Sequence, residues 1–155
     1  MTDERSLGEL SRTEALCLLA SVPVGRLVFT HQALPAIRPV NGLVEDDMVV
    51  IGLTAGSAIA ASSGAGGTVV AYEADSLDPA QRSGWTVIVV GLARLETDPD
   101  AVLGYRARLR PWLAGAMTDV LTISSEIVTG YRLVPAVPAD EIARAAEKWS
   151  GRSRC

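Results

Sequence analysis

The sequence predicts a mainly β protein whose strands form an antiparallel sheet closed as a small barrel, with short helices at its periphery. About six strand-like segments follow one another with short turns between them, which is typical of an antiparallel barrel. Helix signals occur only as short insertions between these segments. The composition, 48% hydrophobic and 21% charged over 155 residues, suits one folded domain with a substantial core.

The N-terminal part combines a polar start with a capped helix. We expect residues 1–10 to be loose, because MTDERSLGEL is polar and lacks the apolar core of a signal peptide. Ser11 and Glu14 have the spacing of a capping box and predict a helix start. This helix should end before Pro23, since proline disfavours helical geometry in the preceding residue.

Strand signals dominate residues 25–95. Gln32-Ala33 and the acidic residues 45–47 are expected as tight turns, and the polar residues 74–84 as a surface loop. Pro39 lies inside a predicted strand; because proline donates no ladder hydrogen bond, its position indicates an edge, a bulge or a backbone that faces a ligand. The strands expected here are 25–31, 36–44, 48–53, 68–73 and 85–95.

The last third is predicted to hold a helix, a divided strand and a terminal helix. Asp98 and Pro99 begin the first helix, with Asp98 as its cap. A sixth strand is expected within 119–134, split in its middle. The predicted division is a flexible N-terminus at 1–10, a barrel domain at 11–135, and a C-terminal helix with a frayed tail at 136–155.

The net charge of −4 and the pI of about 5.0, without a basic stripe, argue against nucleic-acid binding. One histidine makes a His-based metal site unexpected. No apolar run reaches the roughly 20 residues needed to cross a membrane. We therefore expect a cytoplasmic protein with no metal, no nucleic-acid partner and no membrane partner.

The segment Thr54-Ala55-Gly56-Ser57 ends a predicted strand and opens a short helix at Ala58. Backbone N–H groups and hydroxyls in such a segment suit a phosphate. The same residues also form an ordinary helix start with Ser57 as the N-cap. The residues alone leave both interpretations open.

Several short motifs, in this order and with these gaps, resemble the pyridoxamine 5′-phosphate oxidase-like, FMN-binding split-barrel family, in particular its small actinobacterial-type flavoproteins. The resemblance covers residues 10–134. The motifs are Gly25-Arg26-Leu27, Pro39-Val40-Asn41, Thr54-x-Gly56-Ser57, Ser83-Gly84-Trp85 and Glu126-Ile127-Val128-Thr129-Gly130.

The resemblance implies a six-stranded split barrel that forms a homodimer with FMN at the subunit interface. It implies that residues of the second strand line the flavin ring, that the loop before the short helix holds the phosphate, and that two further residues approach from the partner subunit. These cofactor-binding residues are, in turn, Arg38, Pro39, Val40 and Asn41; Thr54, Gly56 and Ser57; and Arg82 and Trp85.

Two positions depart from the family pattern. Ala58 stands where the family commonly has a phosphate-binding lysine, a contact worth about 1.5–3 kcal/mol. Arg26, Arg38 or Arg82 are candidates to replace it. Gly42 stands where an aromatic residue is common in relatives, which would leave the ring less covered.

No general acid–base pair can be identified, and in flavin enzymes the cofactor carries the reaction. The resemblance implies an FMN-dependent oxidoreductase that transfers a hydride between a nicotinamide or small organic substrate and the flavin. Two alternatives stay open: a deazaflavin-dependent reductase of the same fold, and a non-catalytic dimer that binds a flavin, a haem or no cofactor.

Overall fold

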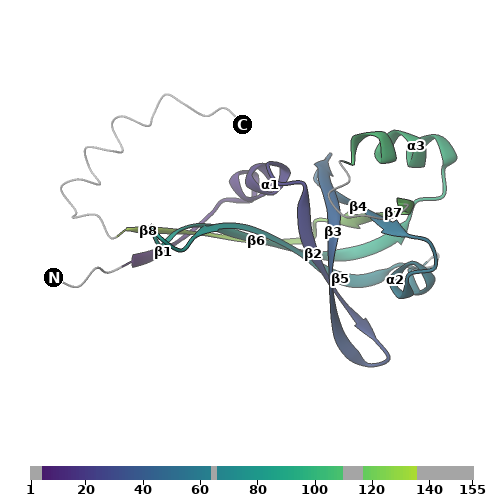
Figure 1. Ribbon diagram of the computed structural model, residues 1–155, viewed down its shortest axis with the longest axis horizontal. Helices are drawn as coiled ribbons and strands as arrows, with labels where there is room; N and C mark the ends of the chain where they lie inside the picture. The colour runs from purple at the N-terminus through teal and green to yellow at the C-terminus, as the bar shows by residue number, and fades with distance from the viewer. Residues whose placement is uncertain (1–4, 64–65, 110–116, 136–155) are drawn as a thin grey trace.

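The structure is a computed structural model that describes residues 5–63, 66–109 and 117–135. These residues form one antiparallel sheet of eight strands with three short helices (Figure 1). The elements are β1 (Arg5–Glu9), α1 (Arg12–Ala20), β2 (Val24–His31), β3 (Leu34–Glu45), β4 (Met48–Thr54), α2 (Ala58–Ser62), β5 (Thr68–Asp78), β6 (Ser83–Leu95), α3 (Pro99–Arg108), β7 (Met117–Ser124) and β8 (Ile127–Pro135).

The barrel closes because β6 changes partner along its length. Its first part, residues 84–90, pairs with β8, and its last residues, 93–95, pair with β7. Strands β6, β5, β2, β3, β4 and β7 therefore form a closed ring, while β8 and β1 continue the sheet outward as an arm. The predicted fold class, a mainly β six-stranded split barrel with short peripheral helices, is confirmed.

The helix starts follow local chemistry that the sequence predicts. The Ser11 hydroxyl accepts from the Glu14 backbone N–H at 3.3 Å, and the Glu14 carboxylate accepts from the Ser11 N–H at 2.9 Å. This capping box satisfies two N–H groups that a helix start otherwise leaves unpaired. Asp98 caps α3 in the predicted way, with Pro99 in the first turn. Helix α1 ends before Pro23, as expected.

Two expectations about irregular segments are wrong. Residues 5–9, expected to be loose, form β1, which pairs with β8. Residues 74–84, expected to be a surface loop, belong mostly to strands, since β5 continues to Asp78 and β6 begins at Ser83. Most side chains at this end of the hairpin are exposed, so the sequence is polar like that of a loop. Its backbone nevertheless continues the hydrogen-bonded pairing of β5 with β6. The predicted helix at 138–149 and the tail lie outside the described residues.

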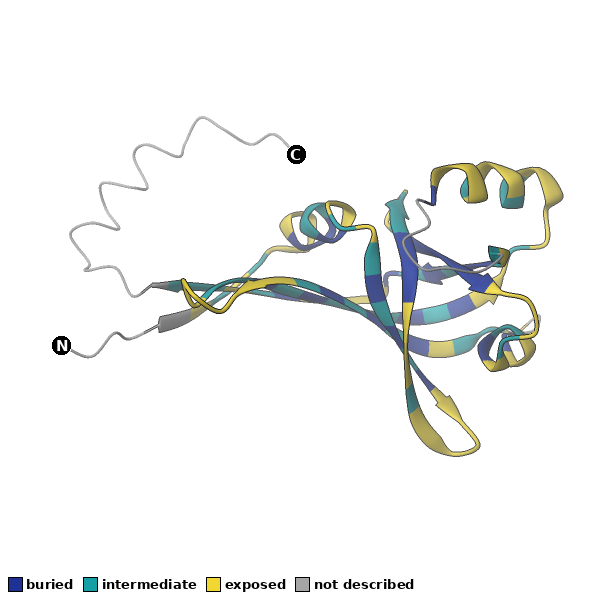
Figure 2. Cartoon of the chain, viewed as in Figure 1, coloured by how far each residue is buried: buried dark blue, intermediate teal, exposed yellow. Residues whose placement is uncertain are grey.

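The core lies inside the barrel and beneath α1. Buried residues of α1, among them Leu16 and Leu19, pack against the same cluster as Leu27, Tyr72 and Val89 of the sheet. Buried and more exposed residues alternate along the long strands (Figure 2), as expected where a sheet covers a core on one side. No helix within the described ranges is long and apolar enough to cross a membrane.

Candidate functional site

A cavity of about 410 Å³ lies between the β2–β3 hairpin, β4 and α2. Its volume is within the range of small-ligand pockets, about 300–1,000 Å³. The apolar part of its lining is Leu27, Phe29, Ala36, Pro39, Val40, Gly52, Leu53, Ala58, Ile59 and Met117. The polar part is His31, Arg38, Asn41, Thr54 and Ser57.

One wall of the cavity is the β2–β3 hairpin, which we call the ribbon. Its outer part, residues 29–36, stands free of the rest of the sheet, because β2 pairs with β5 only at residues 26–28. Residues 34–40 of β3 pair only with β2, whereas residues 41–45 pair with β2 or β4, and Asn41 with both. The ribbon projects from the barrel in Figure 1. Pro39 lies in this one-sided stretch, where a missing N–H breaks no second ladder. Of the three placements that the sequence left open for Pro39, an edge, a bulge or a backbone that faces a ligand, the structure shows an edge.

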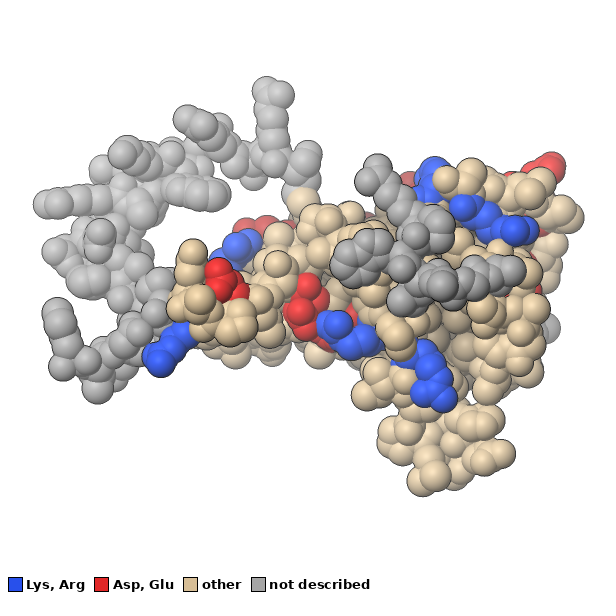
Figure 3. All heavy atoms as spheres, in the orientation of Figure 1, with Lys and Arg blue, Asp and Glu red and all other residues tan. Residues whose placement is uncertain are grey.

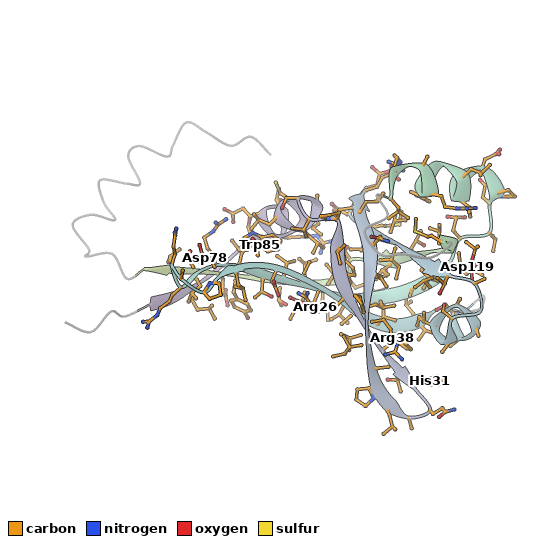
Figure 4. The ribbon with its side chains drawn as sticks, in the orientation of Figure 1. Arg26, His31, Arg38, Asp78, Trp85 and Asp119 are labelled. Atoms are coloured by element: carbon orange, nitrogen blue, oxygen red, sulfur yellow. The ribbon has the colours of Figure 1, made fainter. Side chains whose placement is uncertain are left out.

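Arg38 provides the positive charge of the cavity. It is opposed to Leu27 across the hairpin, so both side chains lie on the same face. Its guanidinium is exposed and donates to the backbone oxygen of Ile37 at 2.8 Å. Arg38 lies at the base of the ribbon and His31 closer to the tip (Figure 4). None of the described residues that line the cavity carries a carboxylate, so this lining favours an anion although the chain is acidic overall.

The loop before α2 leaves one hydroxyl unpaired. Gly56 has φ +71°, and the Ser57 N–H donates to the Thr54 oxygen at 3.4 Å, as in a type II turn. Ser57 occupies the N-cap position, but its side chain makes no capping hydrogen bond. Its hydroxyl is buried without a partner among the described residues. Such a group costs about 1–3 kcal/mol unless something pairs with it. The side-chain cap expected in one interpretation is therefore absent, and the hydroxyl has no partner among the described residues.

Arg26 does not belong to the cavity. Its guanidinium contacts Glu73 and Asp75 at 2.6 Å each, on the opposite face of the sheet from Leu27. Burial alone would raise the pKa of Glu73, but the hydrogen bond and charge of Arg26 outweigh it and lower that pKa. Burial, and then the hydrogen bond with Glu73, raise the pKa of Asp75. Of the three arginines considered as substitutes for the missing lysine, only Arg38 lines the cavity.

The structure does not bring Arg82 and Trp85 to the cavity. Arg82 is exposed in the turn between Asp78 and β6, and Trp85 lies near the same end of the sheet (Figure 4). Trp85 is only 7% exposed and packs into the core of its own chain. Their proposed approach to a partner's site remains a prediction.

Gly42 is also placed differently from the expectation. It does not line this cavity but faces the Tyr72 ring in the core. A side chain at this position would point toward Tyr72 in the core and would not cover the ring of a ligand in this cavity.

The remaining predicted site residues do come together. Arg38, Pro39, Val40, Asn41, Thr54 and Ser57 all line the one cavity, and Gly56 shapes its loop. Sequence reasoning missed the apolar floor. Leu27 and Phe29 could have been found from the alternation in β2, because they share the face of Arg38. Met117 could not, since only the long-range pairing of β7 with β4 places it there.

The surface around the site carries little charge. Figure 3 shows a few separate charged clusters on a largely uncharged face, and the ribbon tip carries none. Within the described residues no group of three or more His, Cys, Asp or Glu side chains could hold a metal ion.

A closed six-stranded antiparallel barrel that splits at one strand, with a cavity between a hairpin and a short helix, defines a protein of the split-barrel class. The chain matches the model of the pyridoxamine 5′-phosphate oxidase family over residues 11–145 and belongs to that family.

Three proteins are similar to this chain in sequence or in structure. The chain is 54% identical over 133 residues to the uncharacterized protein Rv0080 of Mycobacterium tuberculosis, covering 84% of this chain and 88% of that protein. It superposes on the FAD-binding protein of Mycobacterium smegmatis with a TM-score of 0.63 and 28% identity, covering 82% and 98% of the two chains. An FAD-binding protein from Mesorhizobium loti gives a TM-score of 0.61 at 20% identity, covering 81% and 97%, and shows the same fold.

Proposed function

We propose that this protein binds FMN in the cavity and acts as a flavin-dependent oxidoreductase on a small organic substrate. The observation that carries the proposal is the cavity lining. Its described residues join the Arg38 guanidinium and the buried Ser57 hydroxyl, which has no partner among them, to an apolar floor, and none of them carries a carboxylate. A flavin nucleotide combines an apolar ring system with a phosphate, so it matches both parts. The FAD-binding relative from M. smegmatis supports a flavin as the ligand.

Each part of the lining has a role in this proposal. Leu27, Phe29 and Ile59 would pack against the ring, and Asn41 would meet its polar edge. Arg38 and the Ser57 hydroxyl would hold the phosphate, taking the place of the lysine that Ala58 replaces. A hydrogen bond to a charged group contributes about 1.5–3 kcal/mol, so Arg38 alone could supply most of the lost contact.

A bound flavin would supply the redox chemistry, accepting a hydride at N5 from a reduced nicotinamide or a small organic donor. The chain's own residues would fix the ring on the β3 ribbon and keep water from its buried side. This role agrees with the described part of the lining, in which no general acid–base pair is found.

A deazaflavin-dependent reductase is the second candidate. Ala58 at the edge of the cavity favours it, because the weaker anion site leaves FMN without its usual advantage. The FMN proposal expects FMN to bind more tightly than a deazaflavin cofactor, and the second candidate expects the reverse order.

The test is a titration of the pure protein with FMN, FAD and a deazaflavin cofactor, in which binding is measured as quenching of the cofactor fluorescence. We expect saturable binding of FMN, and tighter binding to the Ala58→Lys variant by about one to two decades. Absence of saturable binding of any flavin would overturn the proposal. Addition of reduced nicotinamide without oxygen should then bleach the bound flavin. If no donor bleached the bound flavin, the proposal of flavin binding would stand and the proposal of an oxidoreductase activity would be rejected.

A further inference from the structure

The side chain of Met117, the first residue of β7, lines the cavity next to the loop before α2. Met117 pairs with Thr54 on β4, and the Ser57 N–H donates to the Thr54 backbone oxygen at 3.4 Å. Asp119, two residues further along β7, is labelled in Figure 4 and shows where this strand passes β4. Met117 therefore borders the loop in which Ser57 would hold a ligand phosphate.

A β-bulge directs Met117 to this place. The pairing of β7 with β4 shifts between Leu53 and Thr54, which leaves Thr118 as an extra residue opposite no residue of β4. Regular alternation would put Met117 on the face opposite to Val120. With the bulge, Met117 packs against the same small cluster as Val120. Bulges occur often beside ligand sites, where they change the direction of one side chain.

The absence of a side chain at Gly52 leaves the space that the Met117 thioether fills. A Cβ atom at Gly52 would overlap the Met117 Sδ and would lie 2.6 Å from its Cγ. The thioether therefore rests directly on the backbone of β4, and Gly52 and Met117 form one continuous part of the cavity lining. Since methionine is long and unbranched, it fills an irregular gap of this kind well.

We propose that Met117 determines which flavin nucleotide the cavity accepts, because its side chain closes the cavity at the phosphate end. FMN ends at its phosphate, whereas FAD continues with a second phosphate and an adenosine. A phosphate held by Ser57 would lie beside Thr54, and Met117 occupies the neighbouring space into which the rest of FAD would extend.

The size of the cavity agrees with selection of the shorter nucleotide. Its volume of about 410 Å³ is near the lower end of the range of ligand pockets, about 300–1,000 Å³. FMN is accepted and FAD is excluded in this account. The inference rests on the proposed flavin site and deepens it, since it assigns the choice between the two nucleotides to one side chain.

The first test compares the affinities of the full chain for FMN and FAD by equilibrium dialysis. Met48→Ala is the matched control for Met117→Ala, because Met48 is also a half-buried methionine but begins β4 and does not line the cavity. We expect the wild type and Met48→Ala to bind FMN at least about ten-fold more tightly than FAD. Met117→Ala should reduce this preference at least about ten-fold, through tighter binding of FAD.

The outcomes separate the role of Met117 from the flavin site itself. If the wild type bound neither FMN nor FAD, the flavin site would be rejected and this inference with it. If the wild type bound FAD as tightly as FMN, or if Met117→Ala kept the preference of the wild type, the flavin site would stand and the role of Met117 would be rejected. Equal loss of the preference in Met48→Ala would also reject that role.

Thermal unfolding tests the contact between Gly52 and Met117 without any ligand. Gly52→Ala should lower Tm by about 2–4 °C or more, because the added methyl group has to displace the thioether. In the Met117→Ala background that space is empty, so the same change should lower Tm by much less. Such non-additivity is expected only for residues in contact. Equal effects of Gly52→Ala in the two backgrounds would show that the thioether does not rest on Gly52 and would overturn the inference.

Discussion

The Tyr72 side chain fills the space that Gly42 leaves open: a Cβ atom at Gly42 would lie 2.5 Å from the Tyr72 hydroxyl oxygen. The Cβ position at Gly25 is blocked by the same ring and by the Glu73 backbone oxygen. Two glycines on paired strands thus make room for one buried aromatic ring in the core of the barrel.

Gly42→Ala should destabilise the protein by about 1–3 kcal/mol, because an added methyl group in a filled core forces neighbours to move. In a domain of this size, a loss of 1 kcal/mol corresponds to about 2–4 °C in Tm. Urea unfolding measures the change. Gly104→Ala in α3 is the control: its Cβ would meet nothing within 4 Å, and we expect a gain of about 0.5–1 kcal/mol. Equal stability of Gly42→Ala and wild type would contradict this packing.

Tyr72 should ionise late. Burial raises its pKa to about 12, partly offset by Arg26. Its pKa in the folded state is thus above the ordinary value of about 10 in the unfolded state. The unfolded chain releases the proton first, so stability should fall between about pH 10 and 12, at a slope of at most about 1.4 kcal/mol per pH unit.

Ultraviolet titration of the three tyrosines tests this directly, since one of them should ionise near the upper end of that range. Tyr72→Phe should remove the late step and flatten the alkaline loss of stability. A variant that keeps the late step would assign it to another tyrosine.

Arg38→Gln should weaken flavin-phosphate binding by about one to two decades, the value of a hydrogen bond to a charged group. Arg26→Gln is the matched control, since Arg26 is engaged with Glu73 and Asp75 outside the cavity. Fluorescence titration with FMN measures both variants. If Arg26→Gln weakened binding as much as Arg38→Gln, the cavity would not be the anion site.

Ser57→Asp should abolish binding of a phosphate ligand, whereas Ser57→Asn should weaken it only modestly. Both replacements are good helix N-caps and nearly equal in size, so the pair isolates the charge. The measurement is the FMN affinity of each variant beside its thermal unfolding curve. Matching affinities for the two variants would place the phosphate away from this loop.

Local chemistry made part of the fold predictable. The α1 capping box and the turn at Gln32-Ala33, where both residues have positive φ, depend on residues that are close in sequence. Strand β1 was missed because its polar sequence becomes a strand only through pairing with β8, more than a hundred residues away.

The candidate site shows the same limit. Arg38, Asn41 and Ser57 were predicted as site residues and do line one cavity. Arg26 forms ion pairs with Glu73 and Asp75 and does not line the cavity. This placement follows from the pairing of β2 with β5, which the spacing of the motifs does not reveal. Arg82 and Trp85 are far from the cavity for a similar reason, because the β5–β6 hairpin carries them to the other end of the sheet.

The free-standing ribbon of β2 and β3 separates the residues that contact a ligand from the residues that stabilise the fold. The residues at its tip contribute a wall of the cavity but little of the buried core, which lies inside the barrel and beneath α1. Insertions or substitutions there can therefore alter which molecule is accepted at small cost to folding. Related chains with this fold can diverge in ligand choice by changing one hairpin while the barrel stays the same.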